Sequence, residues 1–168
     1  MRTTVDKFLW IRMGRLCGGA HPGDGTMLGI LPMNYFLAKT DPETYSIESL
    51  ARDRQTVWDG VRNAQALRAI REMRPGDRVF IYHSMGDACI VGLAKVASAP
   101  RPDPANAKLT VVDFEFLTKL EPPTTLREVK ESGLFADWAL VRQSRLSTMS
   151  APAAFVEWMR QRYGKSKI

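Results

Sequence analysis

Three short segments of the sequence combine aromatic, amide, hydroxyl and arginine side chains, a mixture that a hydrophobic core does not favour. They are residues 58–63 (WDGVRN), 82–84 (YHS) and 142–147 (RQSRLS). An aromatic ring can stack on a nucleic-acid base, amide and hydroxyl groups can satisfy the base edge, and arginines can contact phosphates. The segments therefore predict a base-binding pocket. The alternatives are that Trp58 is a core residue and that the arginines of the third segment form a solvated face.

The motifs of common catalytic sites are missing from this sequence. It contains no GxxxxGK[ST], GxGxxG, HExxH or GxSxG. His83 is the one histidine of the predicted domain, so an alternative function is a nucleotide- or RNA-processing enzyme that uses His83 as a general base. Cys89 begins an apolar strand and is expected to be a small core residue rather than a nucleophile. Two cysteines and two histidines without metal-ligand spacing predict no metal site, and no cofactor is expected.

The predicted elements place the three polar segments at the ends of strands and helices. Apolar periodicity predicts strands at 34–39, 56–58, 78–83, 89–97 and 108–117, with 100–104 as a loop. Caps and spacing predict helices that start at Ser46, Arg62, Thr125 and Pro152, the third with a capping box to Glu128. Binding groups concentrate at such ends, where a rigid scaffold positions them within reach of solvent. Strands interleaved irregularly with short helices predict a mixed α/β small barrel.

Composition indicates one ordinary globular domain. The chain has 168 residues, 45% of them hydrophobic, and its 24 basic against 18 acidic residues give a net charge of +6. This charge is a mild bias toward polyanionic partners. No apolar run approaches the roughly 20 residues of a membrane span, and the cysteine usage fits a reducing compartment, so a soluble cytoplasmic protein is expected. A small-molecule or protein-interaction domain with an incidental basic surface is a further alternative.

The first 32 residues differ from the remainder because six glycines interrupt them without a sustained apolar period. They are expected to be a disordered extension, with Met33 as the true start of translation and 33–168 as the domain. The structural alternative is that residues 8–13 pack on the domain as an added element.

Five ordered stretches of the sequence resemble the EVE domain family. They are 35–47 (YFLAKTDPETYSI), 58–66 (WDGVRNAQA), 76–84 (GDRVFIYHS), 92–96 (GLAKV) and 140–147 (LVRQSRLS). The resemblance implies a PUA-like β-barrel decorated with short helices. It also implies a cleft for 5-modified cytosine or another altered base in DNA or RNA, without catalytic machinery.

The resemblance also assigns roles to individual residues of this chain. It places Trp58 in the pocket wall, with Arg62 and Asn63 orienting the adjoining loop or contacting the ligand. The expected floor consists of Tyr82, His83 and Ser84. The expected rim consists of Lys39, Arg142, Gln143, Ser144 and Arg145.

Overall fold

The computed structural model describes residues 33–168. The expectations for the first 32 residues, including a start at Met33 and the packing of residues 8–13, lie outside this part of the chain. Among the described residues, no helix is both long and apolar enough to cross a membrane.

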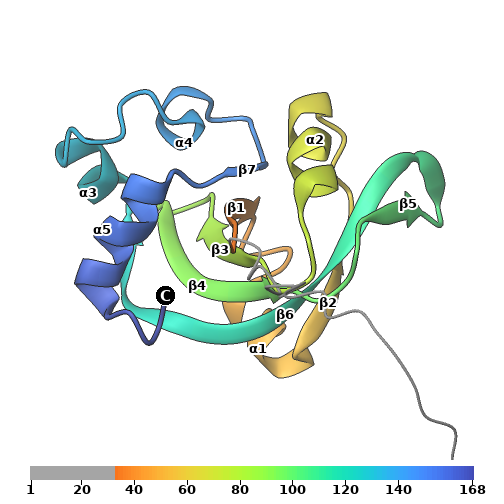
Figure 1. Ribbon diagram of the computed structural model, residues 1–168, viewed down its shortest axis with the longest axis horizontal. Helices are drawn as coiled ribbons and strands as arrows, with labels where there is room; N and C mark the ends of the chain where they lie inside the picture. The colour runs from red at the N-terminus through yellow and green to blue at the C-terminus, as the bar shows by residue number, and fades with distance from the viewer. Residues whose placement is uncertain (1–32) are drawn as a thin grey trace, which may run out of the picture. The chain divides into compact units, whose positions relative to one another are not determined.

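A strongly curved sheet forms the centre of the domain (Figure 1). Its strands are β1 (Tyr35–Thr40), β2 (Gln55–Trp58), β3 (Arg78–His83), β4 (Cys89–Val96), β5 (Arg101–Asp103), β6 (Asn106–Thr125) and β7 (Thr148–Ser150). The strand order is β2-β6-β4-β3-β1-β7, and β5 pairs with β6 as a side hairpin. β1 and β3 are parallel and the other pairs are antiparallel. The long strands β4 and β6 bend across the molecule, so that the sheet forms a half-barrel.

Within residues 33–168, five short helices decorate this half-barrel, which confirms the predicted mixed α/β barrel. They are α1 (Ile47–Asp53), α2 (Ala64–Glu72), α3 (Leu126–Glu131), α4 (Ala139–Arg142) and α5 (Ala153–Tyr163). In Figure 1, α2 stands near the β5–β6 hairpin, whereas α3, α4 and α5 gather at the other side of the sheet.

Local side-chain hydrogen bonds explain where the helices begin. Ser46 Oγ accepts the Ser49 backbone N–H, as its predicted cap role requires. The predicted capping box between Thr125 and Glu128 is also confirmed. α2 begins two residues later than the predicted start at Arg62, because Asn63 is its N-cap.

Three parts of the fold differ from the sequence expectations. The predicted loop 100–104 contains β5, an edge strand that tolerates Pro102 because it pairs only with β6. β6 extends over 20 residues, well beyond the predicted 108–117. α4 and β7 were not predicted, because four and three residues are too short to show a period.

The core joins α5 to the sheet through aromatic rings. Phe155 of α5 packs edge-on against Phe80 of β3 with 5.4 Å between ring centroids, and against Phe135 at 5.3 Å. Trp138 lies 4.5 Å from the same ring. This cluster fixes the segment that leads through α4 to β7, and therefore the loop that contributes Arg145 to the site.

Candidate nucleic-acid interface

One cavity collects side chains from the first and third of the predicted polar segments, together with residues at the end of β1 and before α1. It has a volume of about 710 Å³ and is lined by residues 39–41, 44–45, 56–63, 145 and 147. We call it the Trp58 pocket. The end of β1, the loop before α1, the β2–α2 connection and the loop before β7 form its walls, so segments a hundred residues apart meet there.

Trp58 is at once a core residue and a pocket residue. Its side chain is 8% exposed and its ring packs on Phe114 of β6, with 5.0 Å between centroids. β2 is held on β6 by an antiparallel register that pairs Trp58 with Val112. The core alternative is therefore correct for most of the ring, while the remaining part borders the pocket.

The loop after Trp58 turns sharply and then starts α2. Gly60 has φ +71°, a left-handed conformation that a side chain disfavours, which explains the Asp59-Gly60 turn. Arg62 is exposed and makes no ion pair within the described part of the chain. Asn63 Oδ1 accepts the N–H groups of Gln65 and Ala66, so its oxygen is committed to the helix.

Lys39 carries a positive charge that is partly removed from water. Its Nζ donates to the backbone oxygens of Ser144 at 3.1 Å and Gln143 at 3.4 Å, and lies 5.6 Å from the Tyr82 ring centroid. Burial lowers the pKa of Lys39. An ammonium has three N–H donors, so one donor remains for a ligand in the pocket that Lys39 lines.

The expected floor residues do not line this pocket, and their role in binding a base stays a prediction. Tyr82 is buried in the core. His83 Nε2 accepts the backbone N–H of Ile47 at 3.1 Å, and burial lowers its pKa against the opposing effect of nearby carboxylates. Ser84 donates its hydroxyl to the oxygen of Thr40. These polar groups stabilise the end of β1 and the start of α1. The polar residues at the end of β3 therefore hold neighbouring elements in place.

Of the expected rim residues, some line the pocket and others are engaged elsewhere. Arg145 lines the pocket and is exposed. Arg142 instead pairs on the surface with Asp137 at 3.0 Å. Gln143 and Ser144 contribute their backbone oxygens to Lys39 rather than side chains to the pocket.

Sequence reasoning missed several pocket residues. Tyr45, half-buried, lines the pocket and its hydroxyl donates to Asp53. Thr44 and Ser147 also line it. Tyr45 belongs to the stretch 35–47 that resembles the EVE family, and it directly precedes Ser46, the N-cap of α1. This position could have identified it as a pocket residue. No group of three metal-ligating side chains occurs among residues 33–168.

Comparisons with known proteins identify relatives of the whole domain. A family model of the EVE domain matches residues 34–162. Thymocyte nuclear protein 1 of Rattus norvegicus is 34% identical over 58% of this chain and 55% of the rat protein. The chain thus spans little more than half the length of that curated relative.

Solved structures show the same architecture. Rpa0253 from Rhodopseudomonas palustris is 34% identical with a TM-score of 0.74, covering 79% of this chain and 94% of that one. Human THYN1 protein, in complex with DNA containing 5-methylcytosine, is 25% identical with a TM-score of 0.71, covering 79% and 98%. These neighbours, with one more distant ASCH structure, confirm the expected PUA-like architecture.

Proposed function

Because this chain belongs to the EVE domain family, we propose that it is a non-enzymatic module that binds DNA or RNA and holds a modified base in the Trp58 pocket. The observation that carries this proposal is the convergence of Trp58, Lys39, Arg62 and Arg145 on one cavity. The complex of human THYN1 with 5-methylcytosine DNA supports 5-modified cytosine as the base class.

The pocket offers the interactions that a base and its phosphate require. The rings of Trp58 and Tyr45 border the cavity, and stacking on an aromatic ring contributes about 1–3 kcal/mol per base. That is comparable to the few kcal/mol that extruding a base from a duplex costs. Asp59 can accept from the cytosine amino group, as carboxylates do in base recognition. Arg62 and Arg145 can contact the flanking phosphates.

The geometry of His83 gives no support to the enzymatic alternative. A general base needs a free lone pair, and the Nε2 lone pair of His83 already accepts the Ile47 N–H. Proton uptake at Nε2 would break that contact and loosen the start of α1.

The test is fluorescence-anisotropy binding to matched DNA and RNA oligonucleotides with unmodified, 5-methyl or 5-hydroxymethyl cytosine, at two salt concentrations. We expect a preference for one modified base that Trp58→Leu reduces by about 5- to 160-fold, the equivalent of about 1–3 kcal/mol of lost stacking. Leucine keeps an apolar side chain against Phe114, and thermal unfolding checks that the variant folds.

Arg145→Gln should weaken binding to modified and unmodified oligonucleotides alike, because a phosphate contact carries no base information. Arg127→Gln is the matched control, since Arg127 is exposed and outside the Trp58 pocket. Equal affinity for every base would contradict modified-base recognition. Affinity that ignores salt would favour the small-molecule or protein-interaction alternative.

A further inference from the structure

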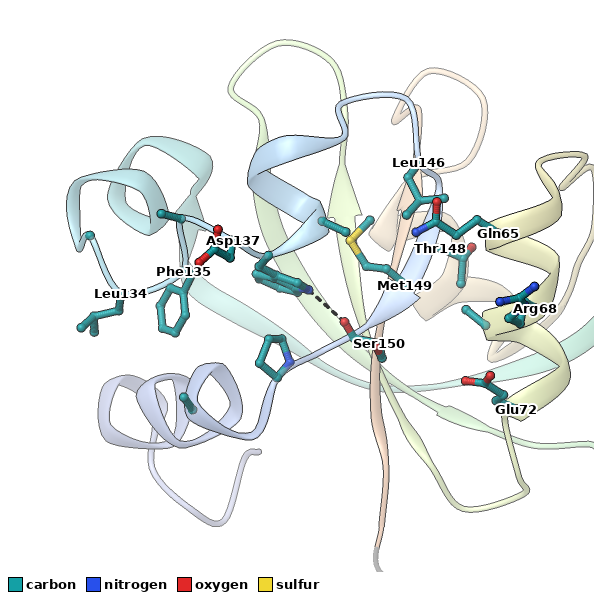
Figure 2. Close-up of a pocket in the computed structure, with 17 residues that line it drawn as sticks. Gln65, Arg68, Glu72, Leu134, Phe135, Asp137, Leu146, Thr148, Met149 and Ser150 are labelled. Atoms are coloured by element: carbon teal, nitrogen blue, oxygen red, sulfur yellow. Dashed lines mark hydrogen bonds between the residues drawn. The ribbon is translucent and has the colours of Figure 1, made fainter.

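A second cavity, of about 660 Å³, lies between α2 and the segment that leads from Gly133 to β7 (Figure 2). We call it the α2 groove. Gln65 and Arg68 line its α2 side, and Leu134 and Trp138 line the other side. The volume falls within the range of about 300–1,000 Å³ that is typical of ligand sites. The groove therefore has room for a group of nucleotide size.

A polar group without a partner lies at this groove. Thr148 of β7 lines it and is fully buried, and its Oγ1 has no hydrogen-bond partner among residues 33–168. Such a hydroxyl has lost its bonds to water without replacement, which is unfavourable in the free protein. Figure 2 shows the exposed Gln65 side chain extending from α2 toward Thr148. When Gln65 turns aside, a ligand in the groove can complete the bonding of Oγ1.

The α2 groove and the Trp58 pocket share two walls. Arg145 and Ser147 line the pocket, whereas Leu146 and Thr148 line the groove, so the segment that leads into β7 has one cavity on each side. On α2, the cap residue Asn63 borders the pocket and Gln65 borders the groove. The two cavities are thus separated by the chain segment 145–148 and by less than one helical turn, which rises about 5.4 Å.

The side chains of the groove match a nucleotide. Leu134 is 68% exposed and offers an apolar contact to a base face. Arg68 is exposed, makes no ion pair in the described region and presents the forked donors that suit a phosphate. Glu72, one turn further on, and Asp137 bring negative charge, but Asp137 is engaged by Arg142.

We propose that the α2 groove holds the nucleotide adjacent to the base in the Trp58 pocket, on the same strand, with Arg68 against its phosphate and Thr148 Oγ1 bonded to a polar atom of that nucleotide. This inference rests on the proposed function, and it adds a direction: the strand leaves the pocket on one side only, along α2.

The test uses the full chain and single-stranded DNA with one 5-methylcytosine, extended by one to three nucleotides on its 5′ or its 3′ side. Extension on one side should tighten binding about tenfold more than on the other. Arg68→Gln should remove most of this gain and reduce the salt slope for the extended strand by about 0.7, the value for one phosphate contact on a single strand. The unextended oligonucleotide should bind both proteins equally.

Two further variants separate the contacts. Thr148→Val should raise the melting temperature of the free protein and reduce the extension gain about 2- to 10-fold, the size of one hydrogen bond. Arg127→Gln, an equal change of charge outside both cavities, should leave the gain intact.

Several results would overturn the inference. They are equal gains on both sides, a gain that survives Arg68→Gln, and a gain lost equally in Arg127→Gln. A free nucleoside monophosphate that binds with the same dependence on Arg68 would make the groove an independent nucleotide site instead. Loss of the modified-base preference in the unextended oligonucleotide would refute the proposed function itself, which is a distinguishable result.

Discussion

Gly92 of β4 is the point where α1 rests on the sheet, and replacing it with alanine tests that contact. A Cβ at this position would lie 2.8 Å from Ile47 Cγ1, closer still to Ile47 Cδ1, and 3.0 Å from the backbone oxygen of Thr118. Ile47 is buried, and the Thr118 oxygen belongs to β6 and has little freedom to move. The added methyl group therefore pushes on α1 rather than into open space.

The cost follows from two opposing effects. Overpacking a filled core costs about 1–3 kcal/mol. Removing glycine from the interior of a strand returns roughly 0.5–1 kcal/mol of backbone entropy. We expect Gly92→Ala to lower the free energy of unfolding by about 1–2 kcal/mol, a measurable part of the 5–15 kcal/mol typical of a domain.

A double-mutant cycle of Gly92→Ala and Ile47→Ala, with the free energy of unfolding measured in urea, tests this contact. Ile47→Ala alone should lose about 2–5 kcal/mol, because it leaves a cavity. In that background the alanine at position 92 meets no isoleucine Cγ1 or Cδ1, and only the 3.0 Å approach to the Thr118 oxygen remains, so Gly92→Ala should cost clearly less than in the natural background. The same loss from Gly92→Ala in both backgrounds would refute the reasoning. A displaced α1 would also shift Thr44 and Tyr45, so the cycle can be repeated with oligonucleotide affinity as the readout.

Two further predictions concern groups that hold the scaffold. Burial lowers the pKa of His83 from its ordinary value of 6.5, so the unfolded chain takes up this proton first: the stability from neutral His83 is complete above pH 6.5 and is lost as pH falls toward the lowered pKa. Urea unfolding between about pH 5 and 7.5 should show this slope reduced in His83→Gln, and an unchanged slope would contradict the assignment. Thr125→Ala removes the capping box of α3 and should lower the free energy of unfolding by about 1 kcal/mol, whereas no change in the urea midpoint would mean that Glu128 alone suffices.

Local chemistry made part of the fold predictable from sequence. Ser46 and Thr125 predict helix starts because their hydroxyl oxygens accept a backbone N–H only a few residues away. The Asp59-Gly60 pair likewise predicts a turn from local chemistry, since glycine adopts the positive φ of this turn without strain. β7 carries no such signal: its three residues are a strand only because Tyr35–Thr40 lies beside them.

Residue type alone predicted the pocket residues correctly only where the side chain is not engaged by a distant part of the chain. Trp58, Arg62 and Arg145 border one cavity, as the residue types indicated. His83 and Ser84 have equally suitable chemistry, but their hydrogen bonds go to Ile47 and Thr40. Those partners are 36 and 44 residues away in the chain, and their proximity is a property of the folded sheet.

The placement of β1 constrains how the protein is made. This strand lies between β3 and β7, and it pairs with β7 through Phe36 and Ser150, more than a hundred residues later. A ribosome therefore releases β1 long before its second neighbour exists, and an unpaired strand edge is prone to the wrong partner. Such distant pairings also slow folding. The Trp58 pocket is lined by both Lys39 and Arg145, so it forms only after Arg145 has emerged, and a product that stops before Arg145 would lack the complete pocket.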